Sequence, residues 1–418
     1  MDAGQGVGVS EALHRYVASA YEQLSAREPS YSFTREEYRA RLERLRAAMA
    51  RDGFDLLLVS SPDAMCWLHG YQSRWYKGHS PTTWPPLQCT VVHVDSDELV
   101  HFDVAHHAEL LRLCSVADHF RLADADGPRE YLSFILDDLR ARGWLRGRAG
   151  MEHWSHVPNR ATSEVVQAAL EGAGCTVADA STTVRGVRRV KSPAEIAKLE
   201  QAAAVCDAGL QAMQAALRPG MTELEAWAAL TSGMAAHGGE PAALHESVVA
   251  GPIELGHAWA STRKLEVGDV VCADPCGVVD RYHANIERYY VLGAEPSDEL
   301  RRLAEIEADA FRLLCTLAKP GVPVRDVTRT IRAFLQDSGV WGLHNWNGGY
   351  EMGCSLPPDW VGEWHFTVGD DDCEDVFEAG VVTNYESIVL YPMIDTVVFE
   401  EGGARTLSRL PLDVLVAG

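Results

Sequence analysis

The stretch that decides the fold is Val267–Arg288, VGDVVCADPCGVVDRYHANIER. Its apolar run, Asp269–Ala273, predicts a buried strand, and after a turn the chain returns as a second strand ending at Asn285–Arg288. Buried carboxylates persist only when they are paired, hydrogen-bonded or functional. We therefore expect this hairpin to carry half of an active site. Its ionisable side chains beyond the apolar run are Asp274, His283, Glu287 and Arg288.

A second segment repeats this pattern later in the chain. Glu266–Asp274 (EVGDVVCAD) aligns without a gap with Glu378–Glu386 (EAGVVTNYE), at an offset of 112 residues (378 less 266). Upstream, Arg218-Pro-Gly resembles Lys319-Pro-Gly, and each follows a predicted long helix and starts another. Two similar halves of this kind would bring two acidic strand ends to one centre.

The composition excludes several classes of protein. The 418-residue chain has 37 Lys+Arg against 60 Asp+Glu, a formal net charge of −23. We expect no nucleic-acid or membrane partner, because such partners need a broad basic surface. The first residues, MDAGQGVGVSEALHRY, lack the pattern of a signal peptide, and no apolar run approaches the ~18 residues of a membrane span.

The ten cysteines are scattered and predict reduced thiols in a cytoplasmic protein. Only Cys272 and Cys276 lie close in sequence. A zinc ion there would need two further ligands, and no second nearby pair exists.

The N-terminal part predicts a helical arm and an α/β domain. Residues 1–30 form the arm, which we expect to pack on a partner subunit. Thr34-Arg-Glu-Glu37 is a capping box for a helix that ends at Gly53. The basic stretch Thr182–Lys191 predicts a linker to a second domain over 186–418. Predicted strands alternate with predicted helices over 31–185, which is typical of an α/β domain. The strands are expected at 54–60, 88–95 and 98–102 and the helices near 104–114, 128–142 and 159–172.

An aromatic, basic loop follows the first of these strands. It reads Gly70–His79, GYQSRWYKGH. Cations and aromatic faces on a loop bind carboxylates or ligand faces, and a solvated loop with packed rings is the alternative. The candidate substrate-binding residues here are Arg74, Trp75, Tyr76 and Lys77.

The second domain begins with two helix signals. Ser192-Pro-Ala-Glu195 is a capping box with proline at the first helical position, and Thr222-Glu-Leu-Glu225 is another box. This order of segments resembles the creatinase/aminopeptidase superfamily, known for the pita-bread fold. The resemblance covers essentially the whole chain, including a linker helix similar to Ser192–Ala203. It implies an α/β N-terminal domain and an α+β pita-bread C-terminal domain with an internal pseudo-twofold duplication.

Metallopeptidases of this superfamily hold two metal ions with two Asp, one His and two Glu side chains. Divalent ions need several anionic or imidazole ligands, which an isoleucine and a neutral tyrosine do not supply. We therefore expect no metal and no other cofactor, which disfavours a metal-dependent Xaa-Pro-type aminopeptidase. On the motifs of the superfamily, the five ligand positions fall at Asp274, Asn285, Tyr350, Glu386 and Ile394.

The metal-free branch of the superfamily gives a better match. Gly256-His257-Ala, Asn285-Ile-Glu287-Arg288 and Asn384-Tyr-Glu386-Ser resemble three creatinase motifs, and Gly349–Glu363 (GYEMGCSLPPDWVGE) is similar to ectoine hydrolase. Both families open a C–N bond of an amidine-type amino acid. The resemblance implies catalytic roles for His257, Glu287 and Glu386. It implies substrate binding by Arg74, Trp75, Tyr76, Lys77, His283, Tyr350, Glu351, Asp359 and Trp360.

The chemistry of these residues fits a planar cation. Two carboxylates, Glu287 and Glu386, would accept hydrogen bonds from the N–H groups of an amidinium. His257 would take a proton from water and deliver it to the leaving nitrogen; initial attack by a carboxylate is the alternative route. We expect a metal-independent hydrolase of a small-molecule substrate, a homodimer whose neighbouring N-terminal loop completes the site.

Other interpretations stay open at this point. Glu287 is also the sequence neighbour of Arg288 and would suit an internal ion pair, and His257 would suit an exposed turn. Asp274 would then be a structural remnant. A lyase on the same fold and a catalytically inactive binding homologue are the alternative functions.

Overall fold

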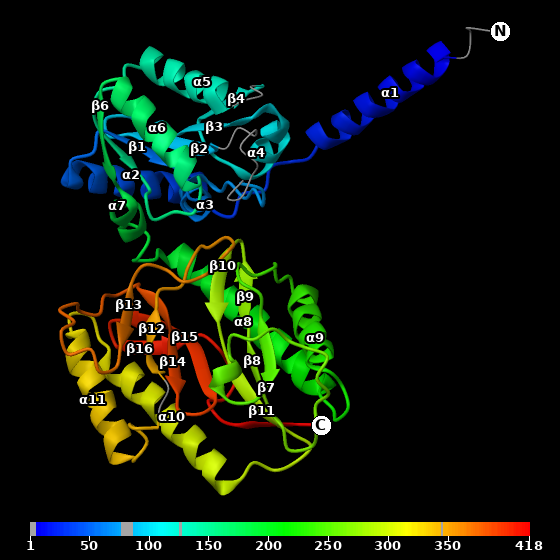
Figure 1. Ribbon diagram of the computed structural model, residues 1–418, viewed down its shortest axis with the longest axis vertical. Helices are drawn as coiled ribbons and strands as arrows, with labels where there is room; N and C mark the ends of the chain where they lie inside the picture. The colour runs from blue at the N-terminus through cyan, green and yellow to red at the C-terminus, as the bar shows by residue number, and fades with distance from the viewer. Residues whose placement is uncertain (1–5, 77–86, 125–127, 344–345) are drawn as a thin grey trace. The chain divides into compact units, whose positions relative to one another are not determined.

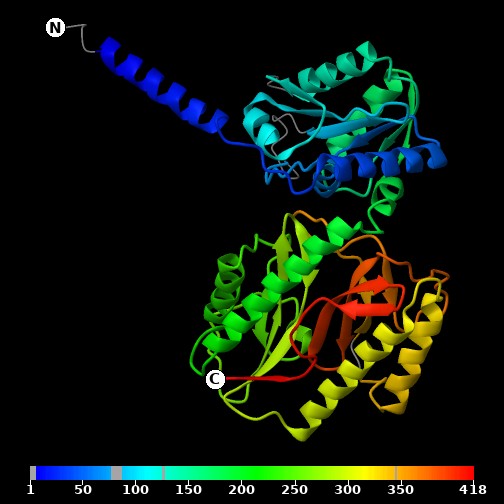
Figure 2. The ribbon, with the colours of Figure 1, turned by 180° about the vertical axis from the view of Figure 1, so that it is seen from behind.

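The computed structural model describes residues 6–76, 87–124, 128–343 and 346–418. The chain divides into two compact units, Met1–Val184 and Arg185–Gly418 (Figures 1 and 2).

The first unit is built on a mixed six-stranded sheet with the order β4-β3-β2-β1-β5-β6. Neighbours β1, β2 and β3 pair antiparallel, and the other pairs are parallel. Apolar strands explain why the sheet is central, since β1 and β2 are buried along their whole length. The strands are β1 (Leu56–Val59), β2 (Cys89–His93), β3 (Val100–Val104), β4 (His119–Ala123), β5 (Gly147–Met151) and β6 (Cys175–Asp179).

Helices cover both faces of this sheet, with α5 and α6 on one face and α2 on the other (Figure 1). The α5 residues Tyr131 and Ile135 and the α6 residue Leu170 share the sheet's apolar core. The short helix α7 occupies the start of the predicted linker, a local structure that the basic sequence did not indicate. The helices are α1 (Gly6–Ser25), α2 (Arg35–Asp52), α3 (Pro62–His69), η1 (Ala105–His107), α4 (Ala108–Cys114), α5 (Pro128–Ala141), α6 (Arg160–Gly172) and α7 (Ser181–Gly186).

Helix α2 has an N-cap at Thr34, which is one half of the predicted capping box, and the predicted end at Gly53. The Thr34 hydroxyl accepts from the backbone N–H of Glu37 at 3.2 Å, and Gly53 ends the helix with φ 73°. The side chain of Glu37 accepts from Arg41 Nε at 3.0 Å.

In the described ranges, no helix combines the length and apolarity that crossing a bilayer requires.

The first half of the second unit places two helices against a four-stranded sheet of order β17-β11-β8-β7 and a β9–β10 hairpin. Capping boxes at Ser192 and Thr222 start both helices, as the sequence predicted. The elements are α8 (Pro193–Ala216), α9 (Glu223–Ala236), β7 (Ser247–Ala250), η2 (Ile253–Leu255), β8 (Val270–Asp274), β9 (Cys276–Val279), β10 (Tyr282–Asn285), β11 (Arg288–Leu292) and the late strand β17 (Leu415–Ala417).

The second half repeats this plan with a five-stranded sheet of order β13-β12-β14-β15-β16. Strand β14 begins at Val382, 112 residues after β8 begins at Val270, which is the offset of the sequence repeat. Helices α8 and α10 lie on the same side of the strands (Figure 2). The elements are α10 (Asp298–Leu317), α11 (Val324–Asp337), β12 (Trp346–Tyr350), β13 (His365–Thr367), β14 (Val382–Ile388), β15 (Pro392–Glu400) and β16 (Gly403–Thr406).

The two halves meet at an antiparallel bridge between Glu287 and Ile394. The Glu287 N–H donates to the Ile394 carbonyl at 3.0 Å, and the Ile394 N–H donates back at 3.2 Å. Arg288 reinforces the join, because its guanidinium donates to the Ile394 carbonyl at 2.6 Å and to the Asp395 carboxylate at 2.8 Å. Arg288 therefore pairs with Asp395, and the Glu287 carboxylate remains on the other side of the seam.

The prediction of one hairpin over Val267–Arg288 is wrong, because the segment forms the three strands β8, β9 and β10 and ends at the first residue of β11. Strand β8 pairs with β7 and β11, whereas β9 pairs with β10 alone. Pro275 separates β8 from β9, since proline has no N–H for a ladder. Asp280 and Arg281 make the β9–β10 turn with φ of 51° and 66°, and both of their N–H groups donate to the Glu240 carboxylate.

Candidate active site

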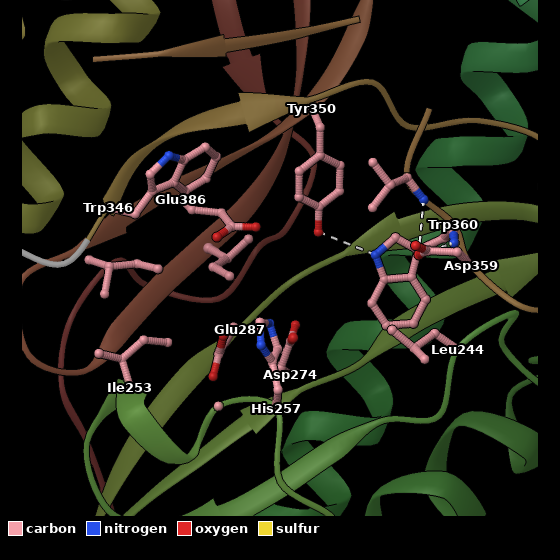
Figure 3. Close-up of a pocket in the computed structure, with 14 residues that line it drawn as sticks. Leu244, Ile253, His257, Asp274, Glu287, Trp346, Tyr350, Asp359, Trp360 and Glu386 are labelled. Atoms are coloured by element: carbon pink, nitrogen blue, oxygen red, sulfur yellow. Dashed lines mark hydrogen bonds between the residues drawn. The ribbon is translucent and has the colours of Figure 1, made fainter. Parts of the chain in front are cut away.

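A cavity of about 380 Å³ lies in the second unit, and both halves contribute to its wall (Figure 3). This volume suits a small metabolite. Four carboxylates line it, those of Asp274, Glu287, Asp359 and Glu386, and all but Asp359 lie in or next to a strand. Asp274 is the last residue of β8, Glu287 directly precedes β11, and Glu386 lies in β14. The described residues of the wall include no Lys or Arg.

Burial raises the pKa values of Asp274, Glu287 and Glu386. It raises the pKa of Asp274 to about 6, with a smaller contribution from the charge of Glu246. Burial, followed by the charge of Asp274, raises the pKa of Glu386 to about 7. Burial, followed by the charges of Asp274 and Glu386, raises the pKa of Glu287 well above its usual range, and Arg288 opposes this only in part. A site that disfavours its own negative charges is stabilised by a cationic ligand.

Two buried amides connect the carboxylates. Asn285 Nδ2 donates to Asp274 Oδ1 at 2.6 Å. Asn384 Nδ2 donates to Asn285 Oδ1 at 3.1 Å and to Glu386 Oε1 at 2.8 Å. A continuous row of hydrogen bonds therefore runs from the acid of the first half to the acid of the second.

His257 follows η2 in an exposed turn and reaches the cavity wall. Its charge lowers the pKa of Asp274, against the larger effect of burial. Figure 3 shows its ring on the same side of the cavity as the carboxylates of Asp274 and Glu287. An imidazole in this place can act as a general base or a general acid.

Aromatic rings form another part of the wall. Trp360 Nε1 donates to the Tyr350 hydroxyl at 3.3 Å (Figure 3), and the Tyr350 N–H donates to Asn384 Oδ1 at 2.9 Å. Burial raises the pKa of Tyr350, so its hydroxyl stays neutral. Asp359 Oδ1 accepts from the Trp360 N–H at 2.7 Å, which orders the turn that presents the indole.

Two residues of the second unit that were predicted to bind substrate, His283 and Glu351, lie outside this wall. His283 is fully buried, its Nε2 accepts from the Ala243 N–H at 3.0 Å, and its Nδ1 donates to the Arg281 carbonyl at 2.9 Å. Burial lowers the pKa of His283 to about 3, so the ring is neutral. Glu351 is paired with the buried ammonium of Lys191. Both side chains are thus committed to contacts within the fold.

The aromatic loop belongs to the first unit. Arg74 is exposed there, the Trp75 ring contacts His107 edge-on at 6.0 Å, and the Tyr76 ring contacts His156 at 6.0 Å. Lys77, the fourth predicted residue of this loop, lies outside the described residues.

Sequence reasoning missed several residues of the cavity. Asp274, read above as a possible remnant, lies in the wall with a raised pKa. Asn384 was visible only as the start of the Asn384-Tyr-Glu386 motif, and its link to Asn285 depends on tertiary structure. Apolar wall residues gave no sequence signal of function, because they resemble core residues; they include Leu244, Ile253, Trp346, Val361, Ile388 and Ile394.

The donor set does not fit the two metal ions that metallopeptidases of this fold hold. The nitrogen of Asn285, not its oxygen, faces Asp274. Tyr350 is a neutral hydroxyl, and Ile394 presents an apolar side chain to the cavity. Across the ranges that the structure describes, no group of three or more His, Cys, Asp or Glu side chains is placed to hold a metal ion.

Comparisons with known proteins agree with this architecture. Residues 197–407 match the model of metallopeptidase family M24, and residues 41–190 match the creatinase/prolidase N-terminal domain. The chain is 26% identical to ectoine hydrolase of Halomonas elongata over 93% of this chain and 99% of that protein. It is 24% identical to creatinase of a Bacillus species over 91% and 92% of the two chains.

Among solved structures, a dipeptidase from Pyrococcus horikoshii superposes with a TM-score of 0.74 at 18% identity, over 90% of this chain and 99% of that one. This likeness concerns the fold. The predicted architecture, an α/β N-terminal domain followed by a duplicated pita-bread domain, is confirmed.

Proposed function

Because the chain belongs to metallopeptidase family M24, we propose that it is a hydrolase that has exchanged the metal chemistry of that family for an acid–imidazole site. Its reaction is the opening of a C–N bond in a small amino acid that bears an amidine or guanidine group. Ectoine hydrolase and creatinase, to which the chain is similar along nearly its whole length, support this class of reaction.

One observation carries the proposal. The carboxylates of Asp274, Glu287 and Glu386, together with that of Asp359, line a cavity whose described wall contains no Lys or Arg. An amidinium group is a planar cation with outward N–H donors, and carboxylates accept from it in charge-assisted bonds. Binding such a cation offsets the burial, and for Glu287 and Glu386 also the repulsion, that raises the pKa values of these acids.

The residues divide the reaction between them. Glu287 and Glu386 hold the cationic carbon in plane, with Asp274 adding negative charge beside them. His257 takes a proton from water, whose oxygen then bonds to the amidine carbon to give a tetrahedral intermediate. The C–N bond breaks as the same imidazolium returns its proton to the leaving nitrogen, which departs as an amine.

The walls around the acids select the rest of the substrate. The rings of Tyr350 and Trp360 offer faces to a flat cation. Substrate carboxylates have no Lys or Arg partner in the described wall. We therefore assign that role to Arg74 of a second subunit, which makes the functional unit a homodimer.

The alternatives are weaker. A metal-dependent aminopeptidase conflicts with Asn285, Tyr350 and Ile394 at three ligand positions. A lyase would use His257 to remove a substrate proton with no addition of water. A binding homologue without catalysis would have no use for an imidazole beside the acids.

A substrate panel tests the proposal. Creatine, ectoine, arginine derivatives and cyclic guanidines are incubated with the full-length protein, and release of the amine is followed. We expect turnover of at least one amidine or guanidine acid. Glu287→Gln should raise KM and lower kcat together, whereas Glu254→Gln, at an exposed position on η2, should leave both unchanged. Unaltered kinetics in Glu287→Gln would remove that residue from the site.

A further inference from the structure

We propose that the side-chain amides of Asn285 and Asn384 form a positioning bridge that stands in for metal ions, tying Asp274 to Glu386 around the cation of the substrate. In its choice of ligand the inference rests on the proposed amidine chemistry. Neither asparagine contacts the substrate in this account; both act through the carboxylates.

The bridge uses every donor of the two amides. An amide NH₂ group has two hydrogens. Those of Asn285 go to Asp274 Oδ1 at 2.6 Å and to the Pro275 carbonyl at 3.2 Å. Those of Asn384 go to Asn285 Oδ1 at 3.1 Å and to Glu386 Oε1 at 2.8 Å. Both amides therefore have one defined orientation, with nitrogen toward the acids.

The backbone holds the bridge in place. Asn384 Oδ1 accepts from the Tyr350 N–H at 2.9 Å, and the Thr396 hydroxyl donates to the Asn285 carbonyl at 2.9 Å. Both asparagines are 0% exposed. Side chains that are buried and fully hydrogen-bonded hold their partners more tightly than side chains in water.

The bridge also blocks a metal at this point. A cation beside Asp274 Oδ1 would meet the N–H of Asn285 rather than a lone pair. Replacing Asn285 by the isosteric aspartate turns that donor into an acceptor. Two carboxylates would then face each other across the former hydrogen bond, an arrangement that divalent cations stabilise.

Calorimetry on the full-length chain tests the bridge with two probes, acetamidinium and Mn²⁺. We expect the wild-type protein to bind acetamidinium and to give no Mn²⁺ heat at millimolar concentration. Asn285→Ala and Asn384→Ala should each weaken acetamidinium binding about tenfold, the effect of losing one hydrogen bond to a charged group. Asn285→Asp should raise the affinity for Mn²⁺ about tenfold or more.

Asn347 supplies the matched control. It is a buried amide of β12 whose Nδ2 donates to the Trp346 and Ile388 carbonyls. Asn347→Ala and Asn347→Asp should change the affinities less than about twofold while lowering the melting temperature like the bridge variants.

Three results would overturn the bridge. The first is tight stoichiometric binding of Mn²⁺ by the wild-type chain, a test that needs no variant to fold. The second is an equal loss of acetamidinium affinity in the bridge variants and the Asn347 variants. The third is an unchanged affinity for Mn²⁺ in a folded Asn285→Asp protein. A protein that passes these tests yet turns over no amidine would contradict the proposed function and leave the bridge standing.

Discussion

At the scale of single residues, the carboxylates of Asp274, Glu287 and Glu386 differ in the groups that stabilise them. Asp274 and Glu386 each accept from an amide, and for Glu287 only the charge of Arg288 is identified as lowering the pKa. Glu287 therefore depends most on a bound cation for its ionised form. In the proposed reaction its carboxylate accepts hydrogen bonds from the amidinium group of the substrate.

The raised pKa of Glu386 makes stability depend on pH. Its pKa is about 7 in the folded chain against 4.5 as the ordinary value. Below pH 4.5 the Glu386 carboxyl is protonated in both the folded and the unfolded chain, so it does not lower the stability of the fold. As pH rises through this window the unfolded chain ionises first, so the fold loses stability, by up to about 3 kcal/mol when the window has been crossed.

Glu386→Gln removes this loss, because glutamine does not titrate and its oxygen still accepts from Asn384. We expect the variant to gain stability over the wild type between pH 5 and pH 8, by up to about 3 kcal/mol, in urea unfolding. The exposed variant Glu254→Gln should track the wild type at both pH values. A difference between Glu386→Gln and wild type that does not change with pH would contradict the raised pKa.

At the scale of elements, the β9–β10 hairpin places Asn285 by packing on helix α8. Gly277 of β9 makes this possible, since a Cβ there would stand 1.9 Å from the Ala202 carbonyl and 2.7 Å from the Cys206 nitrogen. Both contacts are helix backbone, which cannot swing aside as a side chain would. The hairpin therefore sits closer to α8 than any larger residue allows.

Gly277→Ala should push the hairpin away from α8 and disturb the amide bridge. We expect a loss of about 3 kcal/mol in the free energy of unfolding, together with weaker binding of acetamidinium. Gly402→Ala is the matched control, because a Cβ there meets nothing within 4 Å; it should stay within about 0.5 kcal/mol of wild type. Equal stabilities for the two variants would show that the close approach is not needed.

Sequence patterns foresaw the repeat but not the path of the chain through it. The offset between Glu266–Asp274 and Glu378–Glu386 reappears as the offset of β8 and β14, because both rest on the same local pattern. The split at Pro275 was not foreseen, since only tertiary pairing shows that β8 joins β7 and β11 while β9 joins β10.

In the candidate site too, local sequence motifs located some residues, whereas the contacts of others depend on tertiary structure. His257, Glu287 and Glu386 meet at one cavity, as their motifs suggested. His283 and Glu351 lie beside those motifs yet face other partners, the Ala243 N–H and Lys191, which are 40 and 160 residues away in sequence. Long-range partners of this kind leave no local signal, so a polar residue near a motif looks like a site residue.

At the scale of the whole molecule, the seam between the halves of the second unit organises the site. Glu287 and Ile394 bridge the halves, and the buried Arg288–Asp395 pair lies directly behind them. One apolar core belongs to the first half, and the other, built mainly by the second half, includes Cys272, Tyr289 and Val291 of the first. The cavity therefore forms only when both halves are folded and joined.

The proposed homodimer predicts complementation between inactive chains. His257→Ala and Arg74→Ala proteins should each have little activity. Random dimers of the two should recover about one quarter of wild-type activity, because half of the dimers are mixed and each mixed dimer has one intact site. No recovery after refolding or co-expression would count against donation of Arg74 by a partner.

The central claim is water addition to an amidine carbon without a metal, and one measurement tests it most directly. Chelator-treated protein is supplied with the best substrate of the panel in H₂¹⁸O, and the mass of the product is measured by mass spectrometry. The account predicts one ¹⁸O per turnover at an unchanged rate, and loss of turnover in His257→Ala. Product without ¹⁸O, or activity that vanishes with the chelator and returns with a divalent ion, would contradict it.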